Sequence, residues 1–408
     1  MTRINWPATL ATGLLALTLA PLGVTLPRAE AQATRTTYDF EDGLQGFSTL
    51  LVKAGQFGMD AEGSLTVVKD VVHGGKGALT YTYKPEKVSV RAIVAGVSFP
   101  EATQSISLWV RSNTRTQLVL SLREDDETAY DFPFYVPAHE WTQVRANLDE
   151  FRLGNNSTDE NNKLDISQVH SLALVDIASV LVNIPDLPLV SDFNSQRQVW
   201  LDDVQFSTMP APRAMGEVKA GDQKALLLNN FESGVVDWIA ARVTLEANAP
   251  RFELFPETVS MRVLPEAAGP GGNKTPLEPG GKGLRISYKR SGQDAFAFVR
   301  SVERQDLRAA DRLRLSVNLS QKSLLIVQVK ERDDSEYQYV ILPDNSTGWQ
   351  NVDVPLSALT LAENSKDENN HLDPDQIKEL TLVDASAFAG LGPDDVTLDL
   401  DAVYFTLH

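Results

Sequence analysis

The chain of 408 residues contains no cysteine. This absence excludes disulfides, thiolate metal sites and a lipid-modified N-terminal cysteine. Histidine is also scarce. The chain has five histidines, and they show no metal-binding spacing. Neither G-x-S-x-G nor H-E-x-x-H occurs, so two common hydrolase signatures are missing.

Positive charge is in deficit. The chain carries 37 basic and 55 acidic side chains, which gives a net charge of -18. Nucleic-acid binding needs clustered lysines and arginines to neutralise phosphates, so we exclude it. An anionic membrane surface would also repel this chain.

Long apolar runs are confined to the N-terminus. Arg3 precedes an apolar stretch over 8–26, and three alanines between 29 and 33 offer A-x-A cleavage sites. This pattern predicts a signal peptide over 1–33 and export to the periplasm or the medium of a bacterium. The alternative is a membrane anchor, against which Pro21, Gly23 and the short apolar run argue. No other stretch is long enough to cross a membrane.

A seven-residue motif occurs twice. DENNKLD covers Asp159–Asp165, and DENNHLD covers Asp367–Asp373, 208 positions later. A tryptophan precedes each copy (Trp141, Trp349), and a Leu-Val-Asp sequence follows each. The spacing predicts an internal repeat of domain size.

Other segments recur in the same order. The two units open with YDFEDGLQGF and NNFESGVVDW. Further along, each unit has G-G-K-G followed by a stretch in which apolar and polar residues alternate. Apolar residues alternate in both units, as in Ile106, Leu108 and Val110. This period of two is typical of antiparallel sheets, and no helical period is sustained.

We therefore predict an all-β fold of two tandem antiparallel β-sandwich domains joined by a short linker. The first domain covers 34–208, the linker 209–225 and the second domain 226–408. The proline-rich stretch 184–197 has no counterpart in the second unit and is interpreted as an insertion.

The order of the motifs resembles that of galactose-binding-like jelly rolls. These include carbohydrate-binding modules and the related domain of complex I intermediate-associated proteins. The features are D-F-E-x-G, then G-G-K-G, W-x-x-V, an Asn-rich loop with L-D-x-x-x-I/V, and a closing L-D-D-V-x-F strand. The resemblance implies two tandem jelly rolls that bind glycans on a concave sheet face and hold a structural calcium ion.

Three residues are candidates for ligand binding. Trp109 lies opposite in parity to the apolar residues of its strand, so its ring could form a platform for a sugar. The alternative is that a loop, such as the insertion, covers Trp109. Arg123 and Lys330 also lie off the apolar parity and could donate hydrogen bonds. The core is instead expected to contain Trp141, Trp349, Tyr130 and Tyr337.

The resemblance also implies one metal site in each unit, where the first and last strands of the unit lie side by side. The matching carboxylates are Glu41 and Asp202 in the first unit, and Glu232 and Asp401 in the second. Such groups suit Ca²⁺. The alternative is that these acids are surface residues of edge strands.

The repeated loop could bind calcium through Asp159, Asn161 and Asp165, but it does not match the EF-hand template. Its D-x-x-Q ending has the spacing of a capping box, which favours a structural loop with a short helical turn.

The acidic clusters at 124–127 and 333–336 could perform glycosidic acid/base chemistry, but solvated turns explain them more simply. The two repeats also leave no room for a catalytic barrel, so we do not expect an enzyme. The sequence instead predicts a secreted, non-catalytic protein that binds a polysaccharide or another envelope component. An envelope assembly module without glycan binding is the alternative.

Overall fold

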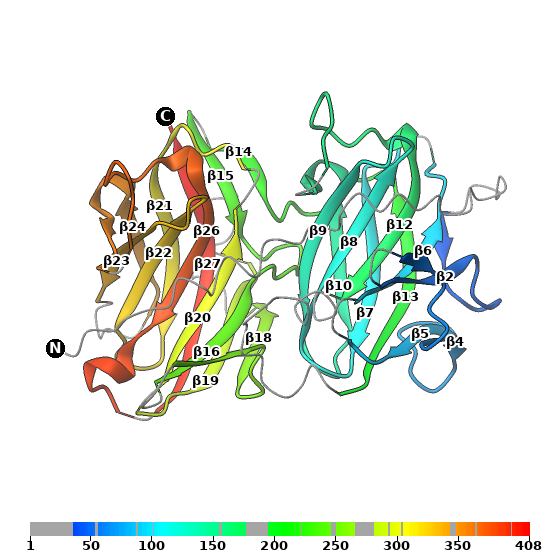
Figure 1. Ribbon diagram of the computed structural model, residues 1–408, viewed down its shortest axis with the longest axis horizontal. Coiled ribbons are helices and arrows are strands. Elements are labelled where there is room, and N and C mark those ends of the chain that lie inside the picture. The colour runs from blue at the N-terminus through cyan, green and yellow to red at the C-terminus, as the bar shows by residue number, and fades with distance from the viewer. Residues whose placement is uncertain are drawn as a thin grey trace.

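The computed structural model describes residues 36–408, apart from 54–55, 87–88, 101, 155–156, 177–194, 221, 246–249, 266–280, 293, 303–304, 343–347, 364 and 393. The predicted signal peptide and most of the predicted insertion lie outside the described residues. Figure 1 shows two β-sandwiches side by side, the first in blue to green and the second in green through yellow to red. The predicted all-β tandem jelly-roll fold is confirmed.

Two antiparallel sheets form the first module. Sheet A has the order β10 (Thr142–Asn147), β7 (Ser105–Ser112), β13 (Arg197–Ser207), β5 (Ala78–Tyr83) and β4 (Ser64–Val68), with β1 (Thr37–Tyr38) also paired to β13. Sheet B has the order β11 (Arg152–Leu153), β9 (Ala129–Val136), β8 (Thr116–Glu124), β12 (Val169–Asp176), β6 (Ser89–Gly96), β2 (Phe47–Lys53) and β3 (Gln56–Gly58).

The second module repeats this plan. Sheet C has the order β14 (Gly216–Ala220), β15 (Gln223–Asn229), β27 (Asp395–Leu407), β19 (Gly283–Lys289) and β18 (Val259–Leu264), and β21 (Ala310–Leu319) joins β27 to β24 (Gln350–Pro355). Sheet D has the order β17 (Pro250–Leu254), β16 (Ile239–Leu245), β20 (Asp294–Ser301), β26 (Ile377–Asp384), β22 (Leu325–Glu331), β23 (Glu336–Ile341) and β25 (Thr360–Leu361).

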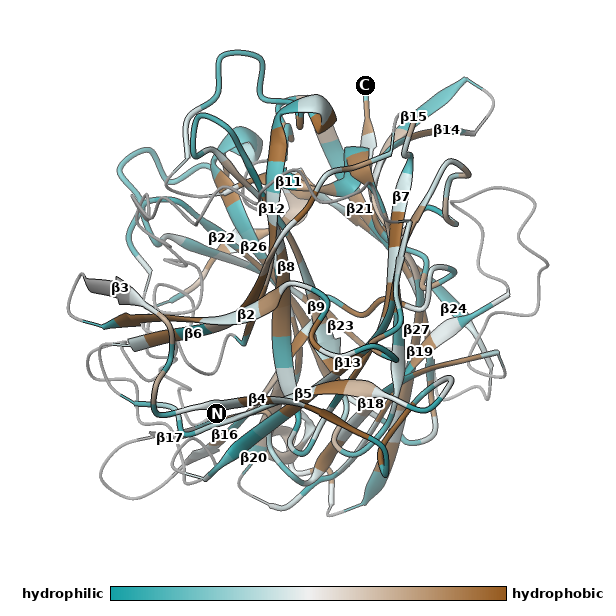
Figure 2. Ribbon diagram, turned by 90° about the vertical axis from the view of Figure 1, so that its right-hand side faces the viewer, coloured by the Kyte–Doolittle hydropathy of each residue, from teal (hydrophilic) through white to brown (hydrophobic). Residues whose placement is uncertain are grey.

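The core of each module lies between its two sheets. Ile106, Leu108 and Val110 are at most 1% exposed, as their alternation predicts. Figure 2 shows the alternation as changes between teal and brown along single strands. Because successive strand residues point to opposite faces, the residues between them face away from the core.

The stretch predicted as a linker contains a strand. Gly216–Ala220 forms β14, which pairs with β15 at the edge of sheet C. Its Val218 packs on a small apolar cluster made by Ala225, Leu227, Ala402 and Tyr404. The segment before β14 is held on the first module, where the Glu150 carboxylate accepts hydrogen bonds from two of its backbone amides.

Short 3-10 helices complete the fold: η1 (Leu148–Glu150), η2 (Ile166–Gln168), η5 (Leu356–Ala358), η6 (Pro374–Gln376) and η7 (Ser386–Ala389). The helical turns predicted after the repeated motif are confirmed as η2 and η6. The predicted capping box is wrong, because neither Asp165 nor Asp373 makes a side-chain cap hydrogen bond. Their carboxylates instead accept hydrogen bonds from Asn161 and Asn369.

Candidate functional site

The repeated DENN(K/H)LD motif forms a loop fixed by buried tyrosines. The hydroxyl of Tyr130 donates to Asp159 Oδ2 at 2.5 Å, and Tyr337 donates to Asp367 in the second module. Both tyrosines are at most 2% exposed, which confirms their predicted place in the core. The same loop geometry therefore recurs because a core side chain anchors its first aspartate in each module.

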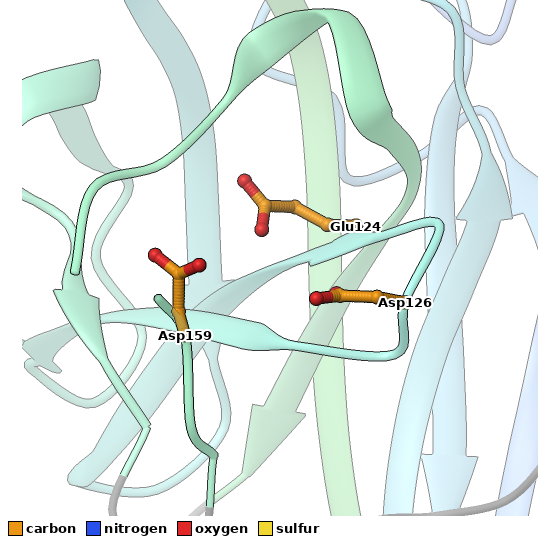
Figure 3. Close-up of side chains that lie close together, drawn as sticks. All are labelled: Glu124, Asp126 and Asp159. Carbon is orange, nitrogen blue, oxygen red and sulfur yellow. The ribbon is translucent and has the colours of Figure 1, made fainter. Parts of the chain in front are cut away.

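The loop brings an acidic triad together in each module. Oxygens of Glu124, Asp126 and Asp159 lie within 4.8 Å of one another, and Figure 3 shows the three carboxylates turned toward a common point. The matching triad of the second module is Glu331, Asp333 and Asp367. Closely spaced carboxylates are suitable oxygen ligands for a hard cation such as Ca²⁺, so the two triads could hold a metal ion.

The sequence predicts that Glu124 lies in a solvated turn, but its side chain is buried. It is 2% exposed, and its Oε1 accepts a hydrogen bond from the backbone N–H of Asp165. Burial raises its pKa to about 6, with smaller contributions from the charges of Asp126 and Asp159, whereas the backbone hydrogen bond opposes the shift. The spacing along the chain could not reveal this environment, since the loop that buries Glu124 comes 35 or more residues later.

The predicted metal ligands of the first module converge on the Gly-Gly-Lys-Gly loop. Asp202 Oδ2 accepts hydrogen bonds from the backbone N–H of His73 at 2.9 Å and of Gly74 at 3.1 Å. Glu41 Oε1 accepts from the backbone N–H of Lys76 and of Gly77. Two distant acids therefore hold one loop, and they do so through backbone amides.

The second module repeats part of this arrangement. Glu232 Oε1 accepts from the backbone N–H of Lys282 at 2.6 Å. A side chain at Gly75 or Gly281 would collide with Glu41 or Glu232, which explains the glycines of this loop. Asp202 and Asp401 are at most 1% exposed on strands paired on both sides, so they are not surface residues of edge strands.

Trp109 lies on the outer face of sheet A and is partly exposed. The ring of His73 stacks on its indole, with centroids 3.6 Å apart and an angle of 15° between the planes. His73 is itself positioned by Asp202 at its backbone and by Asp203, whose Oδ2 lies 3.2 Å from Nδ1. The Gly-Gly-Lys-Gly loop thus fixes one side of the tryptophan.

Trp109 also borders a cavity of about 300 Å³ between the two modules. Trp141 lines the same cavity and is partly exposed, so its predicted place in the core is wrong, as it is for the half-buried Trp349. Trp141 immediately precedes β10, which is an edge strand of sheet A among the residues that the structure describes. Recurrence in both units suggested a core position, but it does not distinguish a core residue from a repeated edge residue.

Arg123 and Lys330 lie on the outer faces of sheets B and D. Arg123 is partly exposed and pairs with Glu127 at 3.0 Å. Lys330 is 2% exposed and lies 3.3 Å from Glu336. Because Trp109 is on sheet A, the structure does not bring Trp109 and Arg123 together; they face opposite sides of the first sandwich.

No protein-family profile and no curated protein sequence matches the chain. Solved structures similar to it include a family 11 carbohydrate-binding module from Clostridium thermocellum, with 16% identity, a TM-score of 0.32, and coverage of 48% of this chain and 97% of that one. A tandem CBM22-1–CBM22-2 domain from Paenibacillus barcinonensis Xyn10C shows 12% identity and a TM-score of 0.27 over 93% of this chain and 99% of that one. These structures are of the kind that the sequence resemblance names.

Within the described part of the chain, no helix combines the length and the hydropathy that a bilayer span requires.

Proposed function

We propose that this protein is an exported, non-catalytic protein that binds a glycan. The observation that carries the proposal is Trp109, a partly exposed indole that His73 holds in a fixed orientation beside a cavity. Sugar rings present C–H groups that pack on aromatic faces, and nearby polar side chains can fix their hydroxyl groups. An aromatic ring that is already ordered loses little conformational entropy when a ligand binds.

The affinity experiment uses native gels that contain a soluble polysaccharide. The panel includes xylan and mixed-linkage β-glucan, since the similar structures include a xylan-binding domain and a module in complex with a β-1,3-1,4-mixed-linked tetrasaccharide. We expect at least one polysaccharide to retard the wild-type protein, and Trp109→Ala to abolish the retardation. Trp349→Ala is the matched control, because Trp349 is partly buried and does not line the cavity.

The outcomes separate the candidate functions. Absence of retardation across a broad panel would overturn glycan binding and favour the envelope assembly module. Retention that survives Trp109→Ala but not Arg123→Ala or Lys330→Ala would move the binding surface to sheet B or sheet D. Release of reducing sugar from any retained polysaccharide would overturn the non-catalytic assignment.

We also propose that Ca²⁺ stabilises the fold. Two sets of carboxylates are available: the terminal pairs, Glu41 with Asp202 and Glu232 with Asp401, and the two acidic triads. Bound calcium would supply positive charge where the triad carboxylates otherwise repel one another. It would also stabilise the folded state by mass action.

A further inference from the structure

The cavity beside Trp109 has walls from both modules. The first module contributes Trp109, Glu140, Trp141 and Gln143 among its described lining residues. The second contributes Arg262 and Lys282, together with apolar residues of β18. Neither module alone encloses this space.

Buried contacts hold the two walls in place. The backbone N–H of Tyr135 donates to the carbonyl oxygen of Val236 across the junction at 2.5 Å. Close to it, the ring of Tyr135 stacks on Phe255 with centroids 6.5 Å apart. Because Tyr135 is 3% exposed and belongs to the apolar core cluster of the second module, the junction is a packed interface.

A second set of contacts lies at the start of the second module. Met215 belongs to the core cluster of the first module, and its sulfur lies 2.7 Å from Nη2 of Arg152 and 3.9 Å from Nη2 of Arg300. The guanidinium of Arg300 also forms a buried ion pair with Asp237 at 2.6 Å. Arg152 donates to the carbonyl oxygen of Ser301 at 3.4 Å, so side chains of both modules interlock here.

The chemistry of the walls is suited to a sugar. Trp109 and Trp141 provide aromatic surface on the first module, and the partly exposed Val263 and Leu264 provide apolar surface on the second. The polar groups include the Gln143 amide and the Lys282 ammonium, of which the ammonium can only donate hydrogen bonds. Small-molecule sites commonly combine an apolar lining with a few polar groups that fix orientation, and 300 Å³ is at the lower end of their size range.

The charges of the walls distinguish Lys282 from its neighbours. Arg262 and Glu140 form an ion pair across the junction and largely neutralise each other. In the described part of the chain, no carboxylate pairs with the ammonium of Lys282, whose backbone Glu232 positions. A polyanionic glycan would be repelled by the net charge of -18, so a hydroxyl-rich neutral glycan is the better match for a single ammonium donor.

We infer that the two modules form one composite binding site, in which a short segment of a neutral glycan stacks on Trp109 and Trp141 and accepts a hydrogen bond from Lys282. The inference rests on the proposed glycan binding and adds its location, its ligand class and a role for the second module. The chain then holds one site that both modules form, in place of a separate site on each module.

The test uses the full chain and two neutral probes, xylan and mixed-linkage β-glucan, with polygalacturonate as the acidic probe. We expect Lys282→Ala to weaken binding of the retained neutral glycan about tenfold, which corresponds to the loss of one hydrogen bond from a charged donor. Lys282→Arg should retain most of the affinity. Lys289→Ala is the matched control, because Lys289 is exposed at the last position of β19, the strand that Lys282 immediately precedes.

Calorimetry of the same proteins gives a second readout. The expected stoichiometry is one glycan segment per chain, and binding should protect tryptophan fluorescence from a soluble quencher. Loss of binding in Trp109→Ala together with unchanged affinity in Lys282→Ala and Lys282→Glu would overturn the composite site and leave glycan binding intact. Two sites per chain, or preferential binding of polygalacturonate, would also overturn it, and a wild-type protein that binds none of the probes would overturn both proposals.

Discussion

Glu379 shows what a single buried acid does to this fold. It lies on the outer face of sheet D, 5% exposed, and its Oε2 has no hydrogen-bond partner within the described structure. Burial raises its pKa to about 7, against which the charge of Lys330 acts. The folded state therefore holds the proton more tightly than the unfolded state does.

The pH dependence of stability follows from this shift. A carboxyl group whose pKa is raised by folding contributes stability below its unfolded value, 4.5, and loses that contribution as pH rises toward about 7. The free energy of unfolding of the Glu379→Gln variant, relative to that of wild type, should therefore rise by roughly 2–3 kcal/mol between pH 4.5 and pH 8. Urea unfolding at both pH values measures the difference, and an equal difference at the two values would contradict the prediction.

At the scale of single elements, the repeated loop and the hairpin turn beneath it form a unit. Tyr130 fixes the loop from the core side, and Glu124 fixes it from the end of β8. The backbone repeats too, since Asn162 and Asn370 both have φ of 55°, in the left-handed region where asparagine is tolerated. The same contacts therefore shape the loop in both modules, and the acidic triad arises where the loop meets the hairpin.

Calcium removal tests whether the acidic triads or the terminal carboxylate pairs bind Ca²⁺. We expect a chelator to lower the melting temperature of the wild-type protein, and added Ca²⁺ to restore it. If the triads hold the ion, Asp126→Ala combined with Asp333→Ala should abolish the response. If the terminal pairs hold it, Glu41→Gln combined with Glu232→Gln should do so instead, and a wild-type melting curve that the chelator does not change would remove calcium from both.

At the scale of the whole molecule, the packed junction makes the two modules dependent on each other. The cores are separate, but Tyr135 of the first module is buried in the core cluster of the second. The ion pair between Arg300 and Asp237 lies beside this contact with both side chains at most 2% exposed. Such an arrangement favours unfolding in one cooperative step.

Asp237→Ala should break that cooperativity. The substitution leaves the Arg300 guanidinium buried without its carboxylate, which typically costs about 3–5 kcal/mol. Differential scanning calorimetry should show one transition for the wild type and two for the variant, with the second module melting first. Asp306→Ala is the control, because it removes an exposed ion pair with Arg308, and a single unshifted transition for both variants would refute the coupling.

Much of this architecture follows from local patterns. The duplication, the strand faces of residues such as Leu108, and the core positions of Tyr130 and Tyr337 could be predicted because alternation along a strand depends only on neighbouring residues. The short helical turn after the repeated motif was predictable for the same reason. Its stabilising contacts were not, since the Asp165 carboxylate accepts hydrogen bonds from the side chains of Asn161 and Gln168 and caps no backbone N–H of the turn.

Contacts between distant segments were decided by the tertiary structure. Glu124 meets Asp159 only because the loop folds back over the hairpin, and Trp141 and Met261 line one cavity only because the two modules pack together. The amino-acid sequence by itself determined two jelly rolls and a tryptophan off the core. Only the packing of one module against the other determined the space that Trp109 faces, because no periodic pattern within a module encodes the surface that its neighbour will present.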